Sequence, residues 1–310
     1  MRHDILRTAA VAAICLSGNW TSSINAQTAP TENAYPPCVW PISNSATPDA
    51  INHTFGPRQY KLSSRYEFGR GIDINVPLET PVHAACDGRV RIAGQNPSYP
   101  QPLVQLQHDR PVGKPFYTNY MYLSEASVRE GDEVKQGQVI GKSGKSPNGY
   151  ERLRFELRDG GTTSSFAVHP LAALPYSNTA APTLEIQSVI PGRQHSKVEL
   201  LVAASSTEVD IVRVELEVTI GTGEPQRIVY DMNEWNRRFK RAQGQTTDPM
   251  GADTIEGIKF TPDPFQIGID EYKLYLTYLE LPPAANAAAI RVSARAVDAG
   301  GKSSETRRPK

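Results

Sequence analysis

The sequence predicts an all-β protein made of two successive β units. Short apolar segments alternate with clusters of Gly, Pro, Asn and Asp along most of the chain, which is typical of short strands joined by turns. The content of 23 Gly and 25 Pro agrees with a large number of turns. At 310 residues the chain is long enough for two domains that each bury their own core.

The first unit is expected to span residues 42–176. Residues 80–85 and 89–93 flank the turn pair Asp87-Gly88, and this alternation around a two-residue turn predicts a β-hairpin. No segment of this unit has the pattern of a long helix. The other apolar segments predict strands at 103–107, 116–123, 134–141 and 153–157.

The second unit is expected to span residues 183–310, after a linker at 178–182. Residues 234–240 are predicted to form a short helix with several basic residues. These basic residues form either a binding face or, as we favour, a solvated helix face. Spaced, alternating segments predict an immunoglobulin-like β-sandwich with strands at 184–190, 197–203, 209–218, 272–278 and 289–297.

Residues 1–26 have the pattern of an export signal. Arg2 and Arg7 supply a basic start, residues 8–16 form a short apolar run, and small and polar residues lead to Ala26. The run is too short to span a bilayer, and no later segment is long and apolar enough to span one. We therefore expect a cleaved signal rather than a membrane anchor, then a flexible lead-in at 27–41, and a secreted, periplasmic protein.

The cysteines agree with export. Cys15 lies within the expected signal, and Ile14 before it is a poor match to a lipoprotein signal. Removal of the signal leaves Cys38 and Cys86, for which an oxidising compartment favours one disulfide bond over two buried thiols. Lys plus Arg and Asp plus Glu both number 33, so the formal net charge is zero, which argues against a nucleic-acid-binding protein.

Several short motifs occur in a fixed order between residues 54 and 170. The motifs are Phe55-Gly56-Pro57-Arg58, Gly71-Ile72-Asp73-Ile74 with Pro77, Thr80-Pro81-Val82, Ala84-Ala85, Asp87-Gly88, Tyr120 with Leu123 and Ser124, Glu130-Gly131-Asp132-Glu133-Val134, Gly137-Gln138-Val139-Ile140-Gly141 with Gly144, Phe155-Glu156-Leu157-Arg158, and His169-Pro170. In this order they resemble the LytM/lysostaphin family of zinc endopeptidases, which cut peptidoglycan cross-bridges. The resemblance implies an antiparallel β domain of the duplicated hybrid motif type.

The resemblance also implies a zinc site. In the family, the ligands are a His four residues before an Asp and the second His of a His-x-His pair, while the first His of the pair and another His assist the chemistry. A catalytic zinc needs about three protein ligands and a water molecule, whose pKa the metal lowers. This chain keeps the ligand Asp as Asp73. Gly69 stands at the position of the first ligand, Arg152 and Arg154 stand at the pair, and Tyr122 stands at the other assisting position.

These replacements predict a domain with no catalytic residues, no bound metal and no cofactor. Gly offers no ligand, and Arg stays cationic and cannot coordinate zinc. We expect Arg154 to form an ion pair with Asp73 in place of the metal, and Asp73, Tyr122, Arg152 and Arg154 to line a binding cleft. An inert cleft is the alternative. His53, His83, His108, His169 and His195 are expected to be surface or packed residues and not a rebuilt metal site.

The expected function is that of an exported, cell-wall-associated protein with an inactive peptidase domain. The resemblance implies that such a domain binds peptidoglycan or regulates a cell-wall hydrolase. One alternative is an active peptidoglycan metalloendopeptidase with non-standard zinc ligands. Another is a structural envelope protein in which both β units only hold partners.

Overall fold

The computed structural model describes residues 35–42, 51–53, 55–60, 65–176, 181–191, 197–206, 211–242, 253–255, 258–261, 272–280 and 290–307. The expected signal at 1–26, the first part of the lead-in, most of the linker and His195 lie outside these residues. Within the described ranges, no helix combines the length and the apolar character that a membrane span requires.

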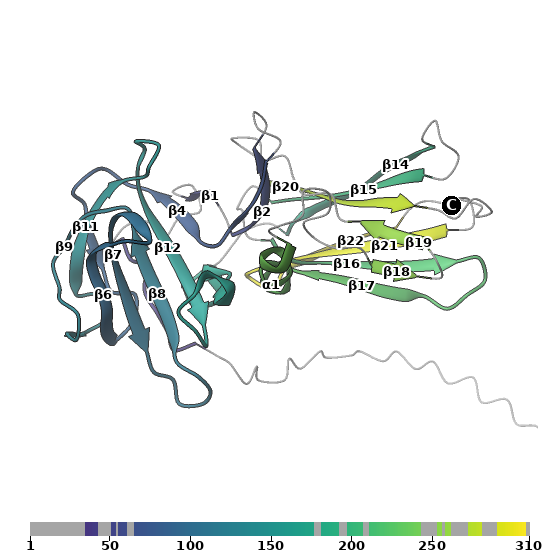
Figure 1. Ribbon diagram of the computed structural model, residues 1–310. Helices are drawn as coiled ribbons and strands as arrows, with labels where there is room; N and C mark the ends of the chain where they lie inside the picture. Colours follow the sequence, from purple (N-terminus) through teal and green to yellow (C-terminus); the bar gives the residue numbers. More distant parts are fainter. Residues whose placement is uncertain are drawn as a thin grey trace, which may run out of the picture. The chain divides into compact units, whose positions relative to one another are not determined.

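The first half of the chain forms a curled antiparallel sheet, so the predicted all-β character of this part is confirmed (Figure 1). A separate two-stranded sheet pairs β2 (Gly56–Tyr60) with β3 (Arg65–Gly69). The main path of the curled sheet runs in the order β1 (Ile51–His53), β4 (Ile72–Asn75), β12 (Glu151–Asp159), β8 (Phe116–Met121), β7 (Tyr99–His108), β6 (Gly88–Asn96) and β10 (Glu133–Val134). Four further strands branch from it, namely β11 (Val139–Lys145), β5 (Pro81–His83), β9 (Leu123–Ala126) and β13 (Ala167–Val168).

The hairpin predicted around Asp87-Gly88 is wrong. The strand before the turn, β5, pairs with β11, and the strand after it, β6, pairs with β7 and β10. Asp87 explains the divergence, because its carboxylate accepts a 2.8 Å hydrogen bond from the backbone N–H of Gln136 and a 3.1 Å bond from Lys135. The turn is therefore tied to the segment after β10, and it leads from one strand pairing to another.

The core of this part lies under the central strand β12. Leu153, Phe155 and Leu157 alternate along it and are almost completely buried, as the two-residue period of a strand requires. Tyr120 on β8 packs edge-on against Phe155 with ring centroids 5.4 Å apart. Each such side chain contributes about 1.5–3 kcal/mol of burial energy, so β12 is held firmly in the sheet.

Residues 35–42 are fastened to this domain, which differs from the flexible lead-in expected there. Cys38 is disulfide-bonded to Cys86. The indole N–H of Trp40 donates a 2.8 Å hydrogen bond to the carbonyl of Pro175. The hydroxyl of Tyr35 donates a 2.9 Å bond to Asp159. These contacts tie the segment to residues far away in the sequence.

The described residues after 181 form two antiparallel sheets and one helix. The predicted helix is present as α1 (Met232–Ala242), whereas the immunoglobulin-like sandwich stays a prediction. The five-stranded sheet has the order β14 (Thr183–Pro191), β15 (Lys197–Ser206), β20 (Tyr272–Glu280), β19 (Ile258–Thr261) and β18 (Asp253–Ile255). The four-stranded sheet has the order β17 (Gln226–Asp231), β16 (Ile211–Ile220), β21 (Ile290–Asp298) and β22 (Ser303–Arg307).

Candidate functional site

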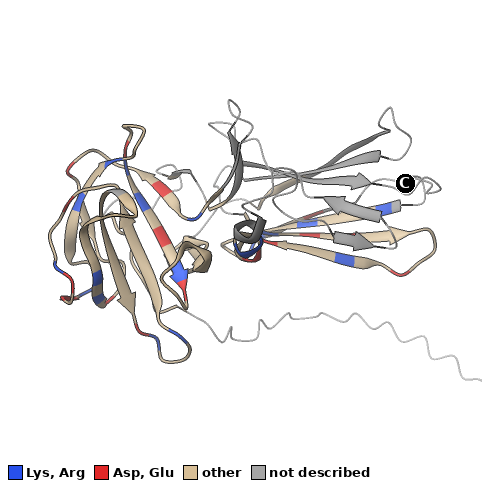
Figure 2. Cartoon of the chain, viewed as in Figure 1, with Lys and Arg blue, Asp and Glu red and all other residues tan. Residues whose placement is uncertain are grey.

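The face of β12 opposite the core carries charged residues at every second position. Figure 2 shows blue and red segments alternating along this strand. The residues are Arg152, Arg154, Glu156 and Arg158, and each is less than 9 % exposed. Charged side chains are rarely buried unless they are paired, so each of them requires a partner within the fold.

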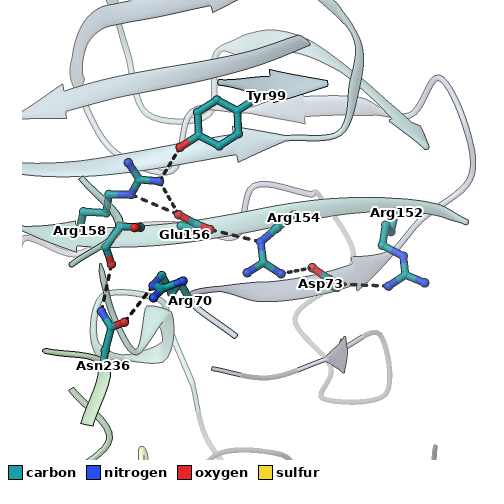
Figure 3. A network of polar contacts seen from close by, with 9 residues as sticks. Arg70, Asp73, Tyr99, Arg152, Arg154, Glu156, Arg158 and Asn236 are labelled. Atoms are coloured by element: carbon teal, nitrogen blue, oxygen red, sulfur yellow. Dashed lines mark hydrogen bonds and ion pairs between the residues drawn. The ribbon is translucent and has the colours of Figure 1, made fainter. Parts of the chain in front are cut away.

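Asp73 is the partner of Arg152 and Arg154 (Figure 3). It lies on β4, directly opposite Arg154 in the antiparallel register, and is 4 % exposed. Its Oδ1 accepts a 3.0 Å hydrogen bond from Arg154 Nη1, and its Oδ2 accepts a 3.0 Å bond from Arg152 Nη1. Both oxygens of the carboxylate are therefore engaged by guanidinium groups.

The ion pairs continue along β12 beyond Arg154. Glu156 Oε1 accepts a 3.2 Å bond from Arg154 Nε, and Glu156 Oε2 accepts a 2.7 Å bond from Arg158 Nη2. Arg158 also donates to the hydroxyl of Tyr99 at 3.0 Å and to the backbone carbonyl of Thr162. We call the five charged residues Asp73, Arg152, Arg154, Glu156 and Arg158 the charge ladder.

The ladder carries three guanidinium groups and two carboxylates, which gives it a formal charge of +1. Burial on its own lowers the pKa of Arg154, but the carboxylates of Asp73 and Glu156 outweigh burial and hold that pKa above its usual range. For Arg158, burial likewise acts to lower the pKa, and the charge of Glu156 raises it above the ordinary value. Arg154 and Arg158 are thus fixed in the cationic form.

Gly71 allows β4 and β12 to approach closely at the middle of the ladder. A Cβ atom at this position would lie 2.4 Å from the carbonyl oxygen of Phe155 and 2.7 Å from Cγ of Glu156. Real Cβ atoms do not make contacts this short. The glycine therefore leaves the space that the Glu156 side chain occupies between its two arginine partners.

The structure brings three of the predicted site residues into direct contact, namely Asp73, Arg152 and Arg154. Tyr122 is half-buried between β8 and β9 with a φ of 64°. Gly69 is buried at the end of β3, where it pairs with Gly56.

The ring of the exposed Tyr150 lies over the guanidinium of Arg152, with 5.0 Å between Arg152 Cζ and the ring centroid.

Sequence reasoning missed Glu156 and Arg158 as members of the site, and it also missed the second bond of Asp73, to Arg152. The signal was present as the alternation of charged and apolar residues from 152 to 158. Such alternation normally indicates a strand with one solvated face. Here both faces of the strand are buried, and only the structure shows this.

Three histidines have described side chains, namely His83, His108 and His169. The ring of His83 bonds the carbonyl of Gly137 at 2.9 Å. His108 bonds the carbonyl of Asp87 and Thr118 Oγ1, each at 2.7 Å, and burial lowers its pKa to about 4. Burial lowers the pKa of His169 to about 3. Among the described residues, no three His, Cys, Asp or Glu side chains gather in a way that could hold a metal ion.

Comparison with known proteins agrees with the order of motifs in the sequence. Residues 67–166 match the family described as Peptidase family M23. Peptidoglycan DD-endopeptidase ShyA of Vibrio cholerae is 34 % identical over 97 residues, which cover 31 % of this chain and 21 % of that protein. The uncharacterized lipoprotein YgeR of Escherichia coli is 28 % identical over 160 residues, which cover 50 % of this chain and 56 % of that protein.

The chain thus spans between about a fifth and just over half of the length of these two relatives. Among solved structures, the catalytic domain of lysostaphin from Staphylococcus simulans is 27 % identical, with a TM-score of 0.35, over 39 % of this chain and 88 % of that one. Residues 67–166 form a domain of the M23 peptidase family, as the resemblance to the LytM/lysostaphin peptidases predicted.

The residues at the ladder do not fit the zinc ion that this family implies. Asp73 offers a carboxylate, but both of its oxygens already accept hydrogen bonds from guanidinium groups. Gly69 has no side chain that could bind a metal, and Arg152 and Arg154 are donors without a free lone pair. A zinc ion placed beside Asp73 would also meet the positive charges of both arginines.

Proposed function

We propose that this protein is an exported, cell-wall-associated protein whose M23 domain is catalytically inactive and binds peptidoglycan or regulates a peptidoglycan hydrolase. Support for the link to the cell wall comes from the M23 match and from ShyA, a relative whose name describes it as a peptidoglycan DD-endopeptidase. The observation that carries the inactivity is the engagement of both Asp73 oxygens by Arg152 and Arg154.

The proposal rests on what hydrolysis by this family requires. A metal with three protein ligands activates the attacking water and polarises the peptide carbonyl. At the ladder, Asp73 is the one family ligand that is present, and its charge is already neutralised by ion pairs. Its neighbours Arg152 and Arg154 are cations and cannot bind a metal. The ladder can therefore supply no metal-activated water, while the scaffold around it keeps the folded shape of the domain.

The proposed destination is the periplasm, and it rests on three observations. Residues 1–26 have the composition of an export signal. Cys38 and Cys86 are bonded, and disulfide bonds persist in oxidising compartments. One of the relatives is named as a lipoprotein, which is a class of envelope protein.

The proposed domain division places the M23 domain at 42–176 and an immunoglobulin-like β-sandwich at 183–310. The strands of the curled sheet fall before residue 169, and the strands of the two later sheets fall after residue 182. Separate sheets on either side of these positions support two units, each with its own strand pairings.

The experiment that tests the function combines metal content, digestion and binding. The purified chain without residues 1–26 is incubated with excess zinc, desalted and analysed for metal, then mixed with purified peptidoglycan sacculi. We expect no retained zinc, no soluble muropeptides and co-sedimentation of the protein with the sacculi. About one zinc per chain together with cleavage that a chelator abolishes would overturn the proposal in favour of an active endopeptidase with other ligands.

If the protein neither cleaves nor co-sediments, peptidoglycan binding is excluded and regulation of a hydrolase is the remaining branch. That branch is tested by adding the protein to a purified cell-wall amidase or endopeptidase. A change in the rate of sacculus digestion supports it. An unchanged rate would leave neither form of the proposal standing.

A further inference from the structure

Helix α1 presents a buried face toward residues of the M23 domain. The helix begins after Asp231, whose Oδ1 accepts hydrogen bonds from the backbone N–H groups of Asn233 and Glu234 at 2.9 and 3.1 Å. This is the geometry of an N-cap, which satisfies donors that have no partner within the helix. Met232, Trp235 and Asn236 follow with helical spacing, and all three are buried.

Asn236 is a polar side chain at the centre of this face, and it is 0 % exposed. Its Oδ1 accepts a 3.0 Å hydrogen bond from Arg70 Nε (Figure 3). Its Nδ2 donates to the backbone carbonyls of Ser164 at 3.0 Å and Ala167 at 2.9 Å. One amide group thus bonds three groups of the M23 domain, and both of its N–H donors are used.

A second asparagine of the helix adds a fourth bond. Asn233 Oδ1 accepts a 2.9 Å hydrogen bond from the backbone N–H of His169. Together the two side chains fasten α1 to the segment 164–169 and to the turn that carries Arg70. Residues far apart in the sequence, between 64 and 166 positions from the helix, are joined in this way.

The groups that α1 fastens lie beside the charge ladder. Arg70 lies between Gly69 and Gly71, in the turn that leads into β4 and Asp73. Ala167 and Val168 form β13, which pairs with Arg158 and Leu157 of β12. The helix therefore holds the turn that leads into β4, and it holds the short strand β13, which pairs with the end of β12.

We propose that α1 is a latch, supplied by the chain that follows the M23 domain, which closes the Glu156–Arg158 end of the charge ladder and holds the Arg70 turn and segment 164–169 against β12. The surface that these residues form is occupied by a segment of the same chain. A wall polymer or hydrolase must therefore bind elsewhere, or displace the helix. The second β unit becomes part of how the M23 domain is built, and not only a spacer.

A displaced latch would remove hydrogen bonds from groups at this end of the domain. The two carbonyls, the Arg70 guanidinium and the Asn236 amide would each lose a hydrogen bond unless water entered. Water that enters at this end reaches the bonds of Arg158 and Glu156. Loss of the latch is therefore expected to loosen β12 and β13 as well as the helix.

Hydrogen–deuterium exchange of the full chain tests this inference. Asn236→Ala removes three of the four latch bonds, and Arg237→Ala is the matched control on the exposed side of the same helix. In Asn236→Ala we expect the amides of residues 156–158 and 167–168 to exchange about tenfold faster or more. The variant loses the hydrogen bonds to the Arg70 guanidinium and to the carbonyls of Ser164 and Ala167, and each lost bond lowers the free energy needed to open this region. Arg237→Ala is expected to leave them unchanged.

Exchange that rises only within residues 232–242 would overturn the inference, because the helix would then be docked without supporting the ladder strands. If Asn236→Ala does not fold, Asn233→Ala removes a single bond at a half-buried position and is measured at the same amides. A smaller rise at 167–168 supports the latch, and no rise contradicts it. Neither result depends on peptidoglycan binding. The latch proposal can therefore be contradicted while the proposed function stands, and the proposed function can be contradicted while the latch proposal stands.

Discussion

Asp73 and Arg154 lie directly opposite each other on β4 and β12, and Arg154 Nη1 donates a 3.0 Å hydrogen bond to Asp73 Oδ1. Arg152 occupies the other oxygen at the same distance. The position at which the peptidase relatives are expected to hold a metal is thus filled by an ion-paired carboxylate. The proposed inactivity of the domain and its stability both depend on how much free energy is needed to break this arrangement.

The first prediction concerns Asp73→Asn. The substitution removes the charge that Arg152 and Arg154 share, and it leaves two buried guanidinium groups facing a neutral amide. Breaking a buried ion pair from one side costs about 3–5 kcal/mol, so we expect a decrease of that order in the free energy of unfolding. Urea denaturation followed by circular dichroism measures it.

Glu125→Gln is the matched control for this prediction. Glu125 is ion-paired with Lys142 on the surface, where both side chains are substantially exposed, so its loss is expected to change stability very little. If Asp73→Asn is as mild as this control, water reaches the ladder freely and the ladder is not the structural centre of the domain.

The strands around the ladder could be predicted from the sequence because alternation and turn residues are local signals. The pairing of Asp73 with Arg154 was expected because the resemblance aligned both positions with one metal site. The bond from Arg152 and the continuation through Glu156 and Arg158 were not expected. They depend on what covers the second face of β12, and that cover comes from segments distant in the sequence.

Two other features illustrate the same limit. The Asp87-Gly88 pair has the local chemistry of a hairpin turn, but the carboxylate of Asp87 is drawn to Gln136, which lies 49 residues later. The basic helix was predicted in the right place, yet its contacts with Arg70 and segment 164–169 leave no local trace in the sequence. Long-range side-chain bonds decided both outcomes.

A second prediction tests the close approach of β4 and β12. Gly71→Ala would place a methyl group 2.4 Å from the Phe155 carbonyl oxygen, so the strands must separate or Glu156 must move. We expect a destabilisation of about 3 kcal/mol. Gly131→Ala is the comparison, because Gly131 has a φ of 92° and no atom within 4 Å of the new Cβ, so it suffers only conformational strain of about 1–2 kcal/mol. Equal costs in thermal unfolding would show that the strands yield easily.

The third prediction is a loss of stability in mild acid. Burial lowers the pKa of His108 to about 4 in the folded state, while the ordinary value of 6.5 applies to the unfolded chain. The unfolded state therefore binds more protons below pH 6.5, and the stabilising contribution is complete above that pH and is lost as the pH falls toward 4. The loss reaches about 3 kcal/mol at its limit.

Urea midpoints measured between pH 7.5 and 5.5 test this pH dependence, because most carboxylates do not titrate in that range. His108→Gln keeps a polar side chain but removes the titration, so it should flatten the slope. A slope that is the same in wild type and variant would assign the acid sensitivity to other groups, of which the buried His169 is the next to test.

A fourth prediction concerns the bond between Cys38 and Cys86, which are 48 residues apart. Cross-linking at this separation restricts the unfolded chain by about 4 kcal/mol in the chain-entropy account. The Cys38→Ala/Cys86→Ala variant is expected to lose between about 2 and 5 kcal/mol of unfolding free energy. Dithiothreitol should lower the melting temperature of the wild type but not of the variant. A reductant effect of equal size on both would mean that the bond is absent from the purified protein.

The last prediction reverses the replacements at the ladder. A chain with Gly69→His, Arg152→His and Arg154→His regains the ligand pattern that the resemblance implies, and it removes both guanidinium groups that repel a cation and occupy Asp73. We expect this variant to retain about one zinc ion per chain after desalting, whereas the wild type retains none. The same variant with Asp73→Ala is the control, and it should lose the metal because one of three ligands is gone. Equal zinc retention by wild type and variant would place any metal site outside the ladder, and zinc in the variant that survives the loss of Asp73 would show that the carboxylate is not a ligand.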